Sequence, residues 1–500
     1  MANGGIIGTV NTPTSSTATG VWQQQEQYEA KVTDTWPQRA LFTTKSLRFN
    51  SASSDYLSRS NGTPTSLRKY TFSVWTKKTA TGALHTLYSN GTNADNYMYI
   101  HFNNSTEQLE YVDVKSGSYQ VNLKTNRVFR DPSAWYHIVI AVDTTQGTAA
   151  NRVKIYVNGV QETSFATSTY PDQNDDLILN GTNTNIGRYT IESDRFYNGY
   201  MSEVIFIDGQ QLAPTSFGST NSDEVWTPIP YTGTYGDNGY NLQFENAAAL
   251  GTDSSPNGNT FTVNNLTSID QTTDTCTNNF ALANPLNVNA SNVGTFSEGN
   301  TTVKVANSTG FSFGSSSTIG VSSGKWYCEA KIITVDATMV GVSANVAEDA
   351  RDNYPPGVQG GAQSVAILVS SGNKYIDDSG STHGASFSAD DILMIALDLD
   401  NNNVYFGKNG QWFDGSGNAD ESSPNSAIAV TAVGSTAEGA YFFSFGDGGG
   451  SAKGKVSWNF GNASYAISSG NSDADGFGNF EYAVPSGYFA LCTKNLAEYG

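Results

Sequence analysis

Two Asn-Gly turns, each placed after extended apolar runs, constrain the fold of this chain most strongly. The stretch from Trp135 to Gly159 reads WYHIVIAVDTTQGTAANRVKIYVNG and ends on Asn158-Gly159. The stretch from Asp391 to Phe413 reads DILMIALDLDNNNVYFGKNGQWF and contains Asn409-Gly410. A two-residue type I′ turn needs positive φ at both positions, which asparagine and glycine tolerate. Each stretch therefore predicts an antiparallel β module built around such a pair of strands.

The composition favours short strands and loops over helices. Hydrophobic residues make up 38% of the 500 residues and aromatic residues 12%, which is too much apolar material for a disordered chain. Only 14% of residues are charged, and 50 are glycine. Few charges, many turn formers and frequent aromatics are typical of all-β proteins. We expect two antiparallel β-sandwich domains of the jelly-roll kind, preceded by an extended and partly helical arm.

Charge and cysteine usage exclude several classes of protein. The formal net charge is −20 and no Lys/Arg cluster occurs, which argues against binding nucleic acid or anionic membranes. Three widely spaced cysteines fit neither a disulfide framework nor a zinc site. We find no signal peptide pattern and no long apolar run. We therefore expect folding in a reducing cytoplasm and no membrane insertion.

The chain divides into four segments by pattern. We predict an arm over 1–40, a first sandwich over 41–215, an extended connector over 216–290 and a second sandwich over 291–500. Strands are expected at Ser46–Phe49, Tyr70–Thr76, Tyr97–Phe102 and Gln108–Val114 in the first sandwich. The connector is stiffened by prolines and carries several aromatics, so we expect it to pack along its neighbour.

The arm contains the best helix candidate, which covers Val21–Thr35 and ends before Pro37. Its apolar face is too small for stability alone. One hypothesis is an anchor that orders against a partner, and the other is a frayed leader or a strap on its own domain. Under the first, the anchoring residues would be Val21, Trp22, Tyr28 and Trp36.

An ordered set of motifs in the first sandwich resembles a known lectin family. SLRFN, DYL, YTFSVWTKK, WYHIVIAVD, RVKIYVNG, NIGR and YNGYMSEVIFIDG occur in this order. The set resembles a laminin G-like, concanavalin A-like lectin domain. The resemblance implies two packed sheets and binding of sugars or proteins at loops on one rim or face.

The second sandwich resembles a SPRY domain, because GKWY-x-E and ALDLDNNNVYFGKNG both occur at the expected separation. This resemblance implies protein or peptide binding through variable loops, without catalysis. The arm, with GIIGTVNTPTSSTATGVW and EQYEA before TWP, looks like the leader of structural proteins from tailed phages of marine bacteria. Lectin-like and SPRY-like modules follow similar leaders in such proteins.

These resemblances imply a non-enzymatic virion protein, such as a tail fibre or appendage for host attachment. Its partners would be other virion proteins through the arm, and a host surface glycan or protein as receptor. A homo-oligomer, with a trimer as the leading expectation, would supply avidity. One alternative is a structural adaptor or capsid decoration protein without a receptor role. A second alternative is a glycan depolymerase.

Catalytic and metal chemistry have few candidates in this sequence. Retaining glucanases need two carboxylates about 5 Å apart, and in the stretch that most resembles their Glu-x-Asp-x-x-Glu pattern Tyr197 replaces the last carboxylate. We therefore predict no enzyme activity and no cofactor. Calcium is the one metal considered, at an oxygen-rich loop formed by Asp172, Asp175 and Asp176.

Aromatic side chains in polar loops are the remaining candidates for ligand binding. Their faces stack on sugar rings or peptides, while neighbouring Asn and Asp supply hydrogen bonds. The alternative is that most of them are peripheral core residues. The candidates are Tyr97, Tyr119, Tyr170, Tyr189, Tyr197, Tyr354 and Trp412.

Overall fold

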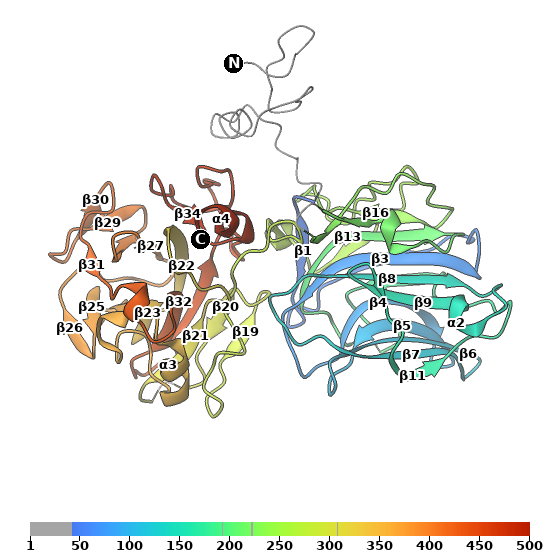
Figure 1. Ribbon diagram of the computed structural model, residues 1–500, viewed down its shortest axis with the longest axis horizontal. Coiled ribbons are helices and arrows are strands. Elements are labelled where there is room, and N and C mark those ends of the chain that lie inside the picture. Colours follow the sequence, from blue (N-terminus) through green and yellow to red (C-terminus); the bar gives the residue numbers. More distant parts are fainter. Residues whose placement is uncertain (1–42, 193, 222–223, 308) are drawn as a thin grey trace, which may run out of the picture. The chain divides into compact units, whose positions relative to one another are not determined.

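A computed structural model describes residues 43–500 except 193, 222–223 and 308. The anchoring residues predicted in the arm, Val21, Trp22, Tyr28 and Trp36, lie outside the described residues. The described part is built from antiparallel sheets with very few helical residues, which confirms the all-β prediction. Two sandwiches follow each other along the chain (Figure 1).

The first sandwich consists of two large sheets. One sheet has the order β10-β9-β8-β3-β13-β1-β18, with β16 also paired to β13, and the other has the order β11-β7-β6-β5-β4-β12-β2-β17. In Figure 1, β3, β8 and β13 lie in one layer and β4, β5 and β7 in the other. The elements are β1 Ser46–Phe49, β2 Tyr56–Ser60, β3 Lys69–Lys78, β4 His85–Asn93, β5 Asn96–Phe102, β6 Gln108–Lys115, β7 Ser118–Val128, β8 Tyr136–Asp143, α2 Ala149–Arg152, β9 Val153–Val157, β10 Val160–Gln161, β11 Phe165–Thr169, β12 Asn183–Ile186 and β13 Gly199–Asp208.

The core of the first sandwich lies between its two sheets. Alternate residues of each strand face inward, as the period of two requires. Phe72 and Val74 from β3 meet Met98 and Ile100 from β5, and all four side chains are fully buried. The predicted turn is also present, since Asn158 and Gly159 both have positive φ. The loop before β9 contains one helical turn, α2.

The segment predicted as a connector, 216–290, is built into the first sandwich. Its strand β16 pairs with β13, β17 pairs with β2, and β18 pairs with β1. The segment therefore adds strands to both sheets as well as linking the two sandwiches. The short helix η1 Pro214–Ser216 leads into the segment, whose elements are β14 Gly218–Thr220, β15 Trp226–Pro228, β16 Tyr240–Leu242, β17 Thr262–Asn264, η2 Ser268–Asp270 and β18 Gln271–Thr272.

The second sandwich also has two sheets. The larger runs β19-β20-β33-β22-β27-β28-β29-β30, with β31 beside β28 and β34 parallel to β22, and the smaller runs β21-β32-β23-β24-β25-β26. Asn409 and Gly410 both have positive φ, as predicted for the turn after β28. The elements are β19 Thr295–Ser297, β20 Thr302–Lys304, β21 Ser312–Ser316, β22 Lys325–Thr334, β23 Thr338–Ser343, α3 Val346–Asp352, η3 Gly361–Gln363, β24 Ser364–Leu368, β25 Asn373–Ile376, β26 Ser379–Ser381, β27 Ile392–Asp398, β28 Asn403–Lys408, β29 Gln411–Phe413, β30 Ala419–Glu421, β31 Ile428–Ala429, η4 Val433–Ser435, β32 Phe442–Asp447, β33 Lys455–Asn459, β34 Phe489–Ala490 and α4 Thr493–Tyr499.

A buried polar cluster lies where the segment after β18 meets both sandwiches. Lys77 of β3 forms an ion pair with Asp274, and both side chains are fully buried. The Lys77 Nζ also donates to Asn279 Oδ1 at 2.9 Å, and Asn462 Nδ2 of the second sandwich lies 3.4 Å from Asp274 Oδ2. A buried charge is tolerated only when it is paired and hydrogen-bonded in this way.

Candidate functional site

The outer face of the first sandwich's β3-β8-β13 sheet is covered by the chain itself. Phe217 and Tyr235 pack over Val139 and Ile205. Beside them, His137 is stacked between Trp75 and Trp226, at ring distances of 4.7 and 6.0 Å. Trp226 Nε1 donates to His137 Nδ1 at 3.0 Å, and burial lowers the pKa of His137 to about 3. This neutral histidine is a packing residue, and its face of the sandwich is closed to a ligand.

The opposite sheet presents a row of aromatic rings on its outer face. Tyr97, Tyr99 and His101 alternate along β5 with core residues, so all three point outward. The Tyr97 and Tyr99 rings are stacked with centroids 6.0 Å apart and an interplanar angle of 13°. Both tyrosines are half-buried, whereas Tyr119 on β7 is 57% exposed. We call Tyr97, Tyr99 and Tyr119 the tyrosine face.

The loop before β13 supports this face from the side. The ring of Tyr189 meets Tyr97 and Tyr99 edge-on, at centroid distances of 5.9 and 5.7 Å. The Arg195 guanidinium lies 4.3 Å from the Tyr189 ring centroid and forms an ion pair with Glu192 at 3.0 Å. These contacts hold the Tyr97 and Tyr99 rings in place. Because Tyr189 is only 4% exposed, it offers little surface to a ligand.

A histidine and a carboxylate complete the face. The His101 ring stacks on Tyr99 with centroids 4.1 Å apart, and its Nε2 lies 3.0 Å from Glu110 Oε2. Burial lowers the pKa of His101, and the hydrogen bond that the Glu110 carboxylate accepts from its ring opposes that shift. The partly exposed Glu110 can accept hydrogen bonds from a ligand beside the Tyr99 ring. The prediction from sequence missed Tyr99, His101 and Arg195, although the alternation in Tyr97–Phe102 marks the first two.

Several predicted aromatic residues lie elsewhere. Tyr197 is fully buried in the first core, with its hydroxyl 2.5 Å from Thr76 Oγ1, and Trp412 is 3% exposed in a cluster with Tyr327. Neither side chain is available to a ligand, so these two predictions were wrong. Tyr170 packs partly against the first core, and Tyr354 packs edge-on against Phe311 on the second sandwich. Neither joins the tyrosine face.

Two of the three aspartates predicted to bind calcium have side-chain partners within the protein. Asp175 Oδ2 accepts a hydrogen bond from the Asp172 backbone N–H at 2.9 Å. Asp176 Oδ1 lies 2.7 Å from Arg68 Nε. Among the described residues, no three His, Cys, Asp or Glu side chains are grouped so that they could hold a metal ion. Calcium binding at this loop therefore stays a prediction.

A cavity of about 310 Å³ opens at the rim of the first sandwich, and we call it the rim cavity. Its walls are mostly apolar. Gly91 and Asn96, which line it, belong to the strand pair that carries Tyr97, and Gly91 is the cross-strand neighbour of Tyr97. The lining residues are Gly62, Pro64, Leu67, Asn90, Gly91, Thr92, Asn96, Lys115, Asp176, Leu177, Ile178, Asn180, Gly181 and Thr182.

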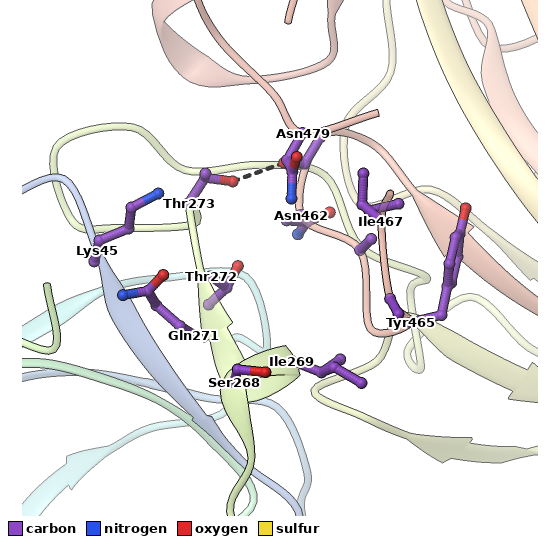
Figure 2. A pocket seen from close by; sticks show the side chains of 13 residues that line it. Lys45, Ser268, Ile269, Gln271, Thr272, Thr273, Asn462, Tyr465, Ile467 and Asn479 are labelled. Atoms are coloured by element: carbon purple, nitrogen blue, oxygen red, sulfur yellow. Dashed lines mark hydrogen bonds between the residues drawn. The ribbon is translucent and has the colours of Figure 1, made fainter. Parts of the chain in front are cut away.

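A second, more polar cavity of about 210 Å³ lies between the β18 region and the loop after β33. Figure 2 shows Lys45, Gln271 and Thr272 on one side of it and Asn462, Ile467 and Tyr465 on the other. The Thr273 hydroxyl donates to the Gly461 carbonyl at 2.7 Å and closes one wall (Figure 2). The amide and hydroxyl groups that line this cavity suit ordered water. Stacked aromatic rings that a ligand could contact lie on the tyrosine face instead.

The comparisons with known proteins agree with the architecture of the first sandwich. A family model described as the concanavalin A-like lectin/glucanases superfamily matches residues 51–214. This match confirms the lectin-type resemblance of that part of the chain. A comparison with curated proteins gave no match. Within the described part of the chain, no helix combines the length and hydropathy needed to cross a bilayer.

The chain is similar over part of its length to solved structures of a candidate carbohydrate-binding protein, a pentraxin and a SPRY domain. A candidate carbohydrate-binding protein from Bacteroides ovatus is 19% identical, with a TM-score of 0.33, over 46% of this chain and 60% of that protein. A heptameric SAP-like pentraxin from Limulus polyphemus is 17% identical, with a TM-score of 0.25, over 34% of this chain and 76% of its own. The SPRY domain of human HERC1 is 17% identical, with a TM-score of 0.22, over 31% of this chain and 86% of its own.

Proposed function

We propose that this protein is a non-enzymatic glycan-binding protein whose tyrosine face contacts the sugar chain. The observation that carries the proposal is the stacked Tyr97–Tyr99 pair on the outer face of the β4-β5-β6-β7 sheet, together with Tyr119, which is 57% exposed. Further support comes from the lectin-type family model that matches residues 51–214. The carboxylates nearby, Glu192 and Asp194, are both engaged by Arg195, which disfavours an acid/base pair for hydrolysis.

The physical basis is stacking combined with a few polar contacts. Each face of a pyranose ring presents C–H groups that pack on an aromatic ring, while its hydroxyls need donors and acceptors at the edge. Glu110 and Arg195 stand at that edge of the tyrosine face. Single contacts of this kind are weak, with dissociation constants on the order of 1 mM or about 4 kcal/mol of binding free energy.

The test is glycan binding by the full chain, first on a glycan array and then by calorimetry with the best ligand. Tyr99→Ala and Tyr119→Ala should each weaken binding by about tenfold, because Tyr119 is the exposed ring of the face and Tyr99 holds the Tyr97 and His101 rings in place. Tyr375→Ala, a half-buried tyrosine of the second sandwich, is the matched control and should bind normally. Unchanged affinity in both tyrosine-face variants would refute the proposal, and release of shortened glycans by the wild type would refute its non-enzymatic part.

We further propose that the protein acts as a receptor-binding appendage of a tailed phage particle, as a homotrimer attached through residues 1–40. Only the resemblance of that leader supports this part of the proposal. Several copies on one particle would raise avidity by roughly 10² to 10⁴. A chain lacking residues 1–40 should fold and bind glycan but fail to enter particles. Normal incorporation of the truncated chain would overturn the anchoring role.

A further inference from the structure

We propose that the rim cavity binds a methyl-bearing sugar residue, so that the protein selects glycans carrying a 6-deoxy sugar or an N-acetyl group. This inference rests on the proposed function and extends it from sugars in general to one chemical class. The cavity of about 310 Å³ lies at the lower end of the sizes of small-molecule sites, which suits one sugar residue. Gly91, which lines the cavity, is the cross-strand neighbour of Tyr97, so the cavity lies at the same strand pair as the tyrosine face.

The shape of the cavity is fixed by hydrogen bonds within its own loops. Asn61 Nδ2 donates to the Gly181 carbonyl at 2.6 Å, and Asn180 Nδ2 donates to Asp208 Oδ1 at 2.7 Å. The Lys115 Nζ donates to the Asp176 carbonyl at 2.9 Å. From below, Asp113 accepts a hydrogen bond from the Ile178 backbone N–H at 2.8 Å. The site is therefore preformed, and little ordering entropy opposes binding.

The chemistry of the walls selects against hydroxyl groups. Two of the amide side chains that line the cavity are already engaged, since Asn96 Oδ1 accepts from the Ser116 N–H at 3.1 Å and Asn90 Oδ1 accepts from the Asn183 N–H at 3.3 Å. The remaining wall is carbon, from Pro64, Leu67, Leu177 and Ile178. A sugar hydroxyl placed there would lose its water without gaining a partner, whereas a methyl group would gain by burial.

The probes are two pairs of sugars that differ at the group in question. Methyl α-L-rhamnopyranoside and methyl α-L-mannopyranoside differ only by the C6 hydroxyl, and N-acetyl-D-glucosamine and D-glucose differ by the acetamido group. We expect the full-length wild type to bind at least one methyl-bearing member about tenfold more tightly than its partner. The pair that shows the preference identifies whether the methyl belongs to a deoxy or an acetyl group.

Variants separate this inference from the proposed function. Leu67→Asn keeps the side-chain size but adds an amide to the wall, and it should remove the preference while leaving the weaker sugar's affinity unchanged. Pro64→Ser is a second variant at a half-buried loop position with the same expectation. If the wild type binds both members of each pair with equal affinity, and Tyr99→Ala still weakens glycan binding, then the inference about the rim cavity is overturned and the proposed function stands. If the wild type binds no sugar at all, the proposed function is overturned as well.

Discussion

The carboxyl group of Asp113 is buried in the first sandwich, where it accepts a hydrogen bond from a residue that lines the rim cavity. Its protonation state in the folded protein can be tested through the pH dependence of stability. Its side chain is fully buried; Oδ2 accepts one backbone hydrogen bond, and Oδ1 has no hydrogen-bond partner. Burial raises the pKa of Asp113 to about 7, from an ordinary value of 3.8. The folded protein therefore holds a proton on Asp113 over a pH range in which the unfolded chain has lost it.

The sign of the effect on stability follows from that difference. Between the unfolded and folded pKa values the native state binds one more proton than the unfolded state, so stability falls as the pH rises. Each pH unit in this window costs about 1.4 kcal/mol. Between about pH 5 and pH 8, Asp113 should therefore remove about 3 kcal/mol from the free energy of unfolding, with most of the loss complete by pH 7.

Asp113→Asn removes the titrating group and keeps its shape. The free energy of unfolding would be measured by urea denaturation of the full chain at about pH 5 and pH 8. Stability should fall with pH by about 3 kcal/mol less in the variant than in the wild type. Asp237→Asn, at an exposed position, is the control and should follow the wild type. If Asp113→Asn shows the same pH dependence as the wild type, then Asp113 is ionised in the folded protein and the reasoning is refuted.

Three further predictions concern the buried cluster, the strand pair at the tyrosine face and metal ions. Lys77→Met should lower the free energy of unfolding by about 3 to 5 kcal/mol in urea denaturation, because Asp274 would remain buried without its cation; a loss below about 1 kcal/mol would contradict this. Gly91→Ala should weaken glycan binding measured by calorimetry, because its Cβ would lie 2.9 Å from the Asn96 carbonyl oxygen and would push β4 away from Tyr97. A chelator should leave the thermal midpoint unchanged, since Asp175 and Asp176 are already satisfied by Asp172 and Arg68; a drop that added calcium reverses would point to a bound ion.

Most of the fold could be predicted because its signals are local. Residue pairs such as Asn158-Gly159 encode a turn through their own backbone preferences, and β1 lies where the pattern of Ser46–Phe49 predicted it. The role of 216–290 could not be predicted in the same way. Its strands β16, β17 and β18 are two or three residues long, and their partners lie far away in the sequence, so no period marks them.

The candidate site was only partly predictable, for a related reason. A tyrosine in a polar stretch looks the same in sequence whether its ring faces solvent or the core. Tyr119 is exposed and Tyr197 is fully enclosed, although both were selected on the same grounds. The alternation of Tyr97, Tyr99 and His101 indicates one shared face, but the sequence does not say which face of the sandwich the rest of the chain covers.

The pairing of β17 with β2 and of β18 with β1 also bears on how the protein is made. During synthesis, the strands up to β13 leave the ribosome before β17 and β18 exist. Until those strands arrive, β1 and β2 are open sheet edges, which are templates for pairing with other chains. The first sandwich is therefore finished only when translation has passed Thr272. A fragment that stops at residue 215 should aggregate, whereas in one that continues beyond β18 the strands β1 and β2 are paired and the edges at their side are the very short β18 and β17.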